Sequence, residues 1–594
     1  MSDPGQSAEE SADAGNGSRP DGRVSSPETL KLRRATHALR LHLDGLPVDY
    51  NLQTSGDRFL AGQAFMFARN RYACAESMIG SGFGGTVIGA ISRSLLVDGL
   101  RWLWIGQEPE RRRALLGDLL AERNRLCILL ETTDTSCPIL PRWIMPAPDV
   151  ADLTGASLAW LDAPSTPSDD ELLYDFVDHA VSTSRPAAPQ LLDQVRGLLN
   201  VQGLHGASLV LAHAGHGNYL GLHSTLTEDG VPGYDLRSDH EALYLHVAAV
   251  GTVATLLGTI NAVPELWPAD VEQEVFTRRA VALAEDVAMA AAPLHRLATS
   301  TRRASLPRPA PRPAQEILRA GAVLAANDLL PDVNSAEHVM AAAREFDDIA
   351  GSFQVKASDH EQPALHAILG LNGAHSTLQA VTITFDQPGS RVMAAFAARM
   401  LLEESARMTW RYSVASDPEA FKARATQYFD EFRYREKKTV RQLRGSGVPK
   451  KDAEQLFARP SNVQMITPND RITANRQPIP SISYMLREMG VAGGYLEPGW
   501  LEVAYSLLSQ VTHSTPIGHL HSMRFDPDGV HGGELSTEMM GLAIDVACLG
   551  SARLIGWFTV LITGGSAEAL AFRRDLWRQA AIVHERARIV HGLD

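Results

Sequence analysis

Two segments of the chain carry the same side chains at the same spacing, and these side chains could do chemistry. Residues 93–104 read RSLLVDGLRWLW and residues 399–410 read RMLLEESARMTW, so both follow the frame R-x-L-L-x-[DE]-x-x-R-x-x-W. Guanidinium groups can stabilise a developing anionic charge, and on a helix the polar positions of the frame share one half of the surface. The candidate catalytic residues are Arg399, Glu404 and Arg407, with Arg93, Asp98 and Arg101 as the second set.

The same spacing has a purely structural interpretation. A carboxylate three residues before an arginine forms an intrahelical ion pair, which stabilises a helix by about 0.2–0.5 kcal/mol. Repetition of the frame indicates a constraint in both segments. It does not distinguish a packing role from a catalytic one.

Histidines follow each frame. LVLAHAGHGNYLGLHS (209–224) parallels LSQVTHSTPIGHLHSM (508–523). Neutral imidazoles can bind a divalent metal, and carboxylates downstream could complete the site. The candidate ligands are His213, His216, His223, His513, His519 and His521, with Asp239, Glu241, Glu534 and Glu538 as carboxylate partners. Because the spacing matches no compact motif such as HExxH, histidines that hydrogen-bond in the interior or cap helices are the alternative.

One segment is strongly basic in a chain whose formal net charge is −14. Residues 433–451 contain eight Lys or Arg and a single acid, and a basic helix there could contact the backbone of RNA or another polyphosphate. The candidate substrate-binding residues are Arg435, Lys437, Lys438 and Arg441. The alternative is a solvated helix face.

Composition indicates the elements that position these residues. Hydrophobic residues make up 45% of the 594 residues and aromatic residues only 6%, and the abundant Ala and Leu favour helix over sheet. The best strand candidate is 381–385, VTITF. Cysteines without a CxxC pair and an acidic, polar N-terminus predict a cytoplasmic protein without a signal peptide. The apolar stretch 247–263 is expected to be a buried helix rather than a membrane span, because its later parallel contains Asp545 and Arg553.

Self-similarity predicts the domain organisation. The frames, the histidine segments and the stretches 246–258 and 545–557 recur about 300 residues apart. We therefore predict an all-α fold of two diverged copies of one helical-bundle unit, related by a pseudo-twofold axis. The expected parts are a disordered tail at 1–27, copy one at 28–298, a proline- and arginine-rich linker at 299–316, and copy two at 317–594. Pro418-Glu419 should begin a helix, and Ser335 should cap another.

The second copy resembles a known family. RMLLEESARMTW (399–410), followed by PIPSISYMLREMG (478–490) and YSLLSQVTHST (505–515), is similar to the helical bacterial family called domain of unknown function 5677, and more distantly to the HEPN helical superfamily. The resemblance covers about 200 residues, and copy one follows it loosely. It implies functional roles for Arg399, Glu404, Ser509 and His513, with His213 as the counterpart of His513 in copy one. The Arg-x4-6-His motif of HEPN ribonucleases has matches at Arg578–His584 and Arg586–His591.

Three functions follow from these patterns. In the first, a HEPN-like enzyme acts on RNA or a nucleotide phosphodiester, in a toxin or phage-defence role, with His513 as general base and Arg399 with Arg407 stabilising the transition state. In the second, a divalent metal held by the histidines acts on a small molecule. In the third, the polar residues are buried networks of a non-catalytic scaffold or sensor. Helical units of this kind often pair, so a homo-oligomer is also a candidate.

Overall fold

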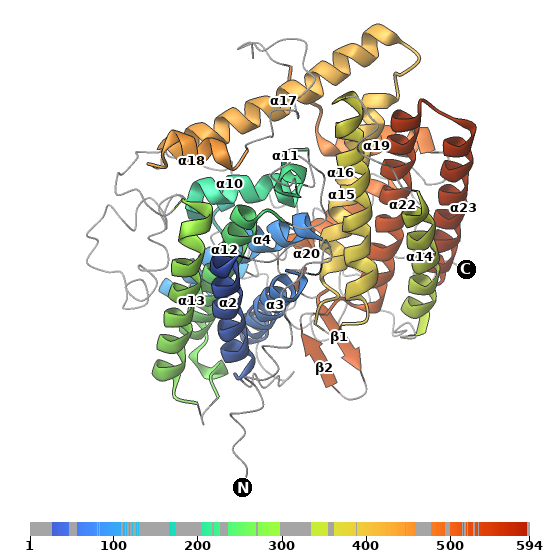
Figure 1. Ribbon diagram of the computed structural model, residues 1–594. Helices are drawn as coiled ribbons and strands as arrows, with labels where there is room; N and C mark the ends of the chain where they lie inside the picture. The colour runs from blue at the N-terminus through green and yellow to red at the C-terminus, as the bar shows by residue number, and fades with distance from the viewer. Residues whose placement is uncertain are drawn as a thin grey trace.

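The protein is described by a computed structural model, and the residues that it describes are almost entirely helical (Figure 1). With short gaps, the structure describes residues 26–46, 56–108, 166–173, 204–225, 236–297, 334–353, 362–457, 477–493 and 499–590, and isolated positions between 111 and 129. The predicted linker at 299–316 and almost all of the predicted tail lie outside these residues. The expected all-α class is confirmed, with one short hairpin of β1 (Met523–Asp526) and β2 (Gly529–Gly532) added to it.

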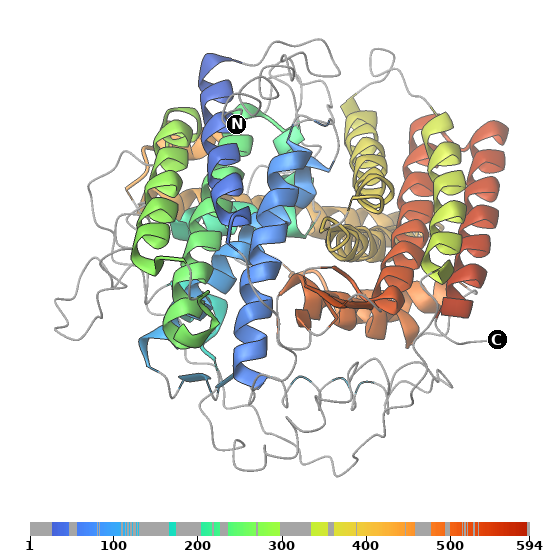
Figure 2. The same cartoon turned by 90° about the horizontal axis from the view of Figure 1, so that it is seen from below.

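The helices of the first half gather on one side of the molecule (Figure 2). Helix α12 is central: it packs along α4 and also contacts α3, α13 and α2, while α10 packs on α4. These helices are α2 (Pro27–Asp44), α3 (Gly56–Met78), α4 (Gly85–Gln107), α10 (Leu204–Gly215), α12 (Ser238–Ala262) and α13 (Gln273–His295). Ser26 caps α2 by accepting a hydrogen bond from the amide of Thr29.

The helices of the second half pack in a similar pattern on the other side (Figure 2). Helix α22 packs along α16 and also contacts α15, α23 and α14, while α20 packs on α16. These helices are α14 (Asn334–Ser352), α15 (Gln362–Thr384), α16 (Met393–Tyr412), α20 (Trp500–Thr512), α22 (Thr537–Thr563) and α23 (Ala567–Val590).

Both frames lie in deeply buried helices. Every residue of α16 is buried, and so are most residues of α4. The neighbouring helices approach closely through glycine. A Cβ atom on Gly251 of α12 would lie 2.4 Å from the carbonyl carbon of Leu95, and one on Gly550 of α22 would lie 2.9 Å from that of Leu401. The absence of a side chain therefore brings backbone against backbone beside each frame.

A long helix crosses one end of the molecule and joins the two halves (Figure 1). This helix, α17 (Pro418–Gly445), contacts α10 and α11 (Tyr219–Leu222) of the first half and α16 of the second. Its start at Pro418 confirms the sequence prediction. The basic segment is not one helix, because α17 ends at Gly445 and α18 (Lys450–Gln455) begins after a turn at Gly447, whose φ of +90° suits glycine.

Two other local predictions are wrong. Residues 381–385 are not a strand, because 381–384 form the last turn of α15. The two β-branched threonines there bond back to the preceding helical turn, so the local strand preference is overridden by helix packing. Ser335 lies inside α14, which begins at Asn334, and not at the position before the helix.

Among the described residues, two helices, α12 and α22, are long and apolar enough to cross a bilayer. The most apolar stretch of α12 is fully buried in the structure, and most of that of α22 is buried. Burial of this extent is also found in the core helices of globular proteins.

Candidate functional site

The frame of α16 forms a buried network of ion pairs. Arg407 pairs with both Glu403 and Glu404, and its distance to Glu404 Oε2 is 3.0 Å. Glu404 also accepts a hydrogen bond of 2.6 Å from the hydroxyl of Tyr428 on α17. The expected pairing of Glu404 with Arg407 is therefore present, and α17 supplies a further partner for the carboxylate.

Arg399 occupies the other end of this network. Its Nε donates to Ser509 Oγ at 3.1 Å, and its Nη2 donates to the hydroxyl of Tyr505 at 3.2 Å. The same guanidinium lies 3.7 Å from Glu403, which also contacts His216 Nδ1 at 3.0 Å. The structure thus brings Arg399 and Ser509 together, two of the residues implied by the family resemblance.

The frame of α4 has a different set of partners. Asp98 is paired with Arg101 at 3.4 Å and with Arg71 of α3 at 2.5 Å. Arg71 is fully buried and also donates to Ser94 Oγ at 2.6 Å. Ser94 in turn donates to the backbone carbonyl of Thr512 at 2.8 Å, which connects this network to the second half.

The two frames meet at a pocket between the halves. It holds about 280 Å³ of empty space, part of it open to solvent, and four side chains that can carry positive charge line it: Arg93, His216, Arg399 and His513. They come from α4, the end of α10, α16 and the end of α20. Arg93 is 23% exposed and pairs with Asp169 at 3.2 Å, whereas the side chain of Arg399 is 8% exposed.

Burial and the arginines control the protonation of the pocket histidines. Burial, helped by Arg399 and Arg93, lowers the pKa of His513 to about 3. Glu403 raises the pKa of His216, but burial and the arginines outweigh it and leave that pKa below its ordinary value. Both imidazoles are therefore neutral at pH 7 in the free protein. A pKa near 3 makes His513 a weak base until a negative charge lies beside it.

Six of the predicted catalytic residues do not line this pocket: Glu404, Arg407, Ser509, Asp98, Arg101 and His213. Arg407 is held by the two glutamates and by the backbone carbonyl of His216, and Arg101 donates to the backbone carbonyl of His513 at 3.3 Å. Both arginines are therefore placed to position the histidine-bearing segments. His213 points elsewhere: its Nε2 lies 3.3 Å from Thr439 Oγ1 of α17, and burial lowers its pKa to about 3.

The histidines that the structure describes do not converge as a metal centre would require. Among the described residues, no group of three or more His, Cys, Asp or Glu side chains is arranged to hold a metal ion. His519 packs edge-on against Phe67, and the side chain of His223 lies outside the described residues. Three of the candidate carboxylates have arginine partners: Asp239 pairs with Arg237, Glu241 with Arg33, and Glu534 with Arg391.

The predicted substrate-binding residues lie on α17. Lys437, Lys438 and Arg441 are exposed, while Arg435 is part-buried and pairs with Glu431 at 2.8 Å. The opposite face of α17 is fixed to α10, where Leu443 packs against Gly206. The exposed charges therefore have a fixed orientation on the surface.

Sequence reasoning missed several members of the networks. These are Arg71, His216 as a partner of Glu403, Glu403 itself, Tyr428 and Tyr505. Glu403 lies inside the frame, at the variable position before Glu404, so the Glu-Glu pair in the sequence was a signal for it. The HEPN-type match Arg578–His584 is not at the pocket: it lies on α23, where His584 contacts Asp545 at 2.8 Å, and His591 is outside the described residues.

Comparison with known proteins gives no family for the chain. No family model, no curated protein and no solved structure matches it.

Proposed function

We propose that the chain binds a phosphate-bearing ligand, an RNA or nucleotide phosphodiester, in the pocket between the two frames. The observation that carries the proposal is the convergence of Arg93, Arg399, His216 and His513 on one pocket from four separate segments. Guanidinium groups bind phosphate oxygens through charge-assisted hydrogen bonds, and a partly enclosed site strengthens them.

The protonation of the histidines supports an anionic ligand. The arginines and burial lower the pKa of His513 in the free protein. An anion between Arg93 and Arg399 would offset the arginine charges and raise that pKa, so that His513 becomes able to hold a proton in the complex. A catalytic role for His513 as general base or acid is therefore proposed for the bound state.

The class of phosphate ligand is inferred from the exposed charges of α17 and from the family resemblance. The exposed Lys437, Lys438 and Arg441 add a cationic surface, and the buried face of the same helix reaches Glu404 through Tyr428. A polyanion on this surface would make several phosphate contacts. The resemblance to the HEPN superfamily extends this to a nuclease in defence or toxicity.

Titration calorimetry with pyrophosphate and with a dinucleotide tests the proposal. Arg93→Gln and Arg399→Gln should each weaken binding about 10- to 100-fold, as expected for loss of charged hydrogen bonds. Arg574→Gln, an exposed position on α23, is the matched control and should bind as the wild type does. Equal binding by all three variants, or none by the wild type, would leave the buried networks with a scaffold role only.

A second test addresses chemistry. His513→Ala should abolish cleavage of a phosphodiester substrate while the circular dichroism spectrum is preserved. Cleavage retained by that variant removes His513 from the mechanism.

We also propose that the two halves are diverged copies of one unit. Helices α3 and α15 have the same length and precede their frames by the same interval, and α12 packs on α4 as α22 packs on α16. Gly251 faces Leu95 as Gly550 faces Leu401, and these residues occupy equal places in the two frames. A pseudo-twofold arrangement would make the pocket a site shared by the copies.

A further inference from the structure

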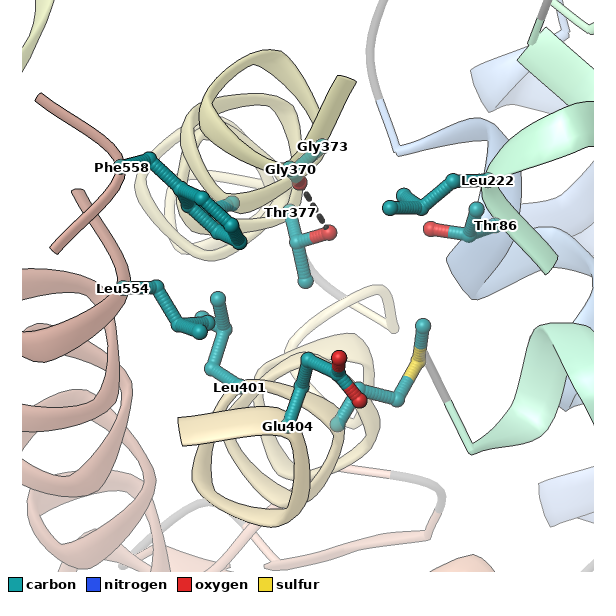
Figure 3. Close-up of a pocket in the computed structure, with 11 residues that line it drawn as sticks. Thr86, Leu222, Gly370, Gly373, Thr377, Leu401, Glu404, Leu554 and Phe558 are labelled. Carbon is teal, nitrogen blue, oxygen red and sulfur yellow. Dashed lines mark hydrogen bonds between the residues drawn. The ribbon is translucent and has the colours of Figure 1, made fainter. Parts of the chain in front are cut away.

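A second pocket lies on the other side of the α16 frame, lined by α15, α16 and α22 of the second half and by Thr86 and Leu222 of the first half. It holds about 400 Å³ of empty space, part of it open to solvent. Its walls are mostly apolar, and its polar side chains are Thr86, Thr377 and Glu404. Figure 3 shows Thr377 of α15 and Glu404 of α16 on opposite sides of the space, with Leu554 and Phe558 along one flank and Leu222 along the other.

The corresponding place beside α4 is filled by two large side chains. Phe67 and Arg71 of α3 precede Arg93 by the same intervals as Gly373 and Thr377 of α15 precede Arg399. In the first half, the guanidinium of Arg71 lies over the ring of Phe67, with 4.1 Å to the ring centroid, and pairs with the frame carboxylate Asp98. In the second half, glycine and threonine leave that guanidinium position without a side chain.

Part of the vacated space is filled by neighbours. A Cβ atom on Gly373 would lie 2.3 Å from Leu222, and one on Gly370 would lie 2.2 Å from the ring of Phe558, so these side chains rest directly on the backbone of α15. The space left is suited to a narrow group rather than to an aromatic ring. Thr377 donates its hydroxyl to the carbonyl of Gly373 at 2.7 Å, and its oxygen can still accept a hydrogen bond.

The frame carboxylate of the second half has one cationic partner fewer. Asp98 pairs with two arginines, whereas Glu404 has one ion-pair partner among the described residues, Arg407, and accepts a hydrogen bond from the neutral Tyr428. Arg407 is also shared with Glu403. Burial leaves the pKa of Glu404 above its ordinary value. Each carboxylate oxygen has a further lone pair available to a donor in the pocket.

We propose that this pocket binds a small molecule with a guanidinium group on a short apolar chain, placing the guanidinium against Glu404 where Arg71 places its own against Asp98. The chain of the ligand lies among Leu222, Leu554 and Phe558. The carboxylate of Glu404 disfavours an anionic ligand. A planar cation with several N–H donors suits Glu404, because the corresponding carboxylate of the first half, Asp98, is paired with a guanidinium. The inference rests on the proposed correspondence of the two halves, but this site is separate from the phosphate pocket and does not depend on phosphate binding.

Calorimetry with n-propylguanidinium tests the proposal, with n-propylurea as the neutral control of the same shape. The wild type should bind the guanidinium compound at least about 10-fold more tightly than the urea, in line with a charge-assisted pair. Glu404→Gln, which keeps the size of the side chain, should remove that preference. Thr377→Arg should restore the arrangement of the first half, abolish binding and raise the unfolding temperature.

Two more variants keep the test decisive if a charge change prevents folding. Ala374→Leu narrows the pocket without altering any charge, and it should weaken binding of n-propylguanidinium at least about 10-fold. Arg93→Gln alters only the phosphate pocket and should leave this binding unchanged. The proposal is overturned if n-propylguanidinium binds no better than the urea, or if Ala374→Leu binds it as the wild type does.

Discussion

The polar frames of α4 and α16 have the same spacing but different ion-pair partners and different packing around them. Beside α4, Asp98 is neutralised by Arg71 and Arg101, and the adjoining space is filled. Beside α16, two glutamates share Arg407, the tyrosines of α17 and α20 complete the network, and a pocket remains next to Glu404. The first arrangement closes a core, and the second leaves the carboxylate of Glu404 beside empty space.

The largest expected effect comes from breaking the closed network. Arg71→Ala leaves Asp98 buried with a single, longer ion pair and should reduce the free energy of unfolding by about 3–5 kcal/mol. Thr377→Ala at the corresponding place in the second half should cost about 1 kcal/mol, for the loss of one hydroxyl contact. Urea unfolding followed by circular dichroism measures both. Similar costs for the two variants would contradict the contrast between a filled and an open site.

The glycine contacts provide a second comparison. Gly251→Ala should destabilise by about 3 kcal/mol, because its Cβ would lie 2.4 Å from backbone atoms that cannot move independently. Gly550→Ala should cost about 1 kcal/mol, since the corresponding distance is 2.9 Å and alanine also favours the helix. Thermal unfolding of the two variants gives the order directly. A larger loss for Gly550→Ala would mean that α16 and α22 are the more tightly constrained pair.

Two contacts of histidine, one in each half, should change the stability of the fold with pH in opposite directions. In the first half, His246 Nδ1 lies 3.0 Å from His295 Nε2, and burial lowers their pKa values to about 4 and about 3. In the second half, His584 pairs with Asp545, which raises the pKa of His584 in spite of burial.

The sign of each effect follows from proton binding in the unfolded chain. His246 and His295 take up protons near pH 6.5 only when unfolded, so stability falls as pH drops below 6.5, by about 2 kcal/mol per histidine between pH 6.5 and 5. His584 adds stability below pH 6.5 and loses it as pH rises through its raised folded pKa. His246→Gln should flatten the acid side of a stability–pH curve, and His584→Gln should lower stability more at pH 6 than at pH 8. If each variant only lowered stability by the same amount at every pH, the pKa directions given for these histidines would be wrong.

The smallest expected effect on stability is on the surface of α17. Charge reversal of Lys437, Lys438 and Arg441 to glutamate should change the free energy of unfolding by less than about 0.5 kcal/mol each, because these side chains are exposed. Binding of single-stranded RNA, followed by fluorescence anisotropy, should nevertheless weaken and lose part of its salt dependence. Reversal of Arg278, Arg279 and Arg574 changes the net charge equally and is the control. RNA binding that falls equally in both variants would reflect net charge alone.

Local pattern was enough to predict part of this structure. The i, i+3 pairs of both frames and the helix beginning at Pro418 follow from spacing along one helix. The partners of the frames come from distant segments, as with Arg71 for Asp98 and Tyr428 for Glu404. No periodicity contains that information, since it depends on how helices cross. The strand prediction at 381–385 failed for the same reason: tertiary packing outweighed β-branched residues.

The bond from Ser94 to the carbonyl of Thr512 spans 418 residues of sequence. During synthesis on the ribosome, α4 therefore emerges long before α20, and the side of α4 that faces α20 must wait for most of the chain to be made. Arg71 and Asp98, which are close in sequence, can pair early and satisfy each other during this interval. The closed network of the first half can thus protect a nascent intermediate, whereas the pocket between the frames can form only when translation is nearly finished.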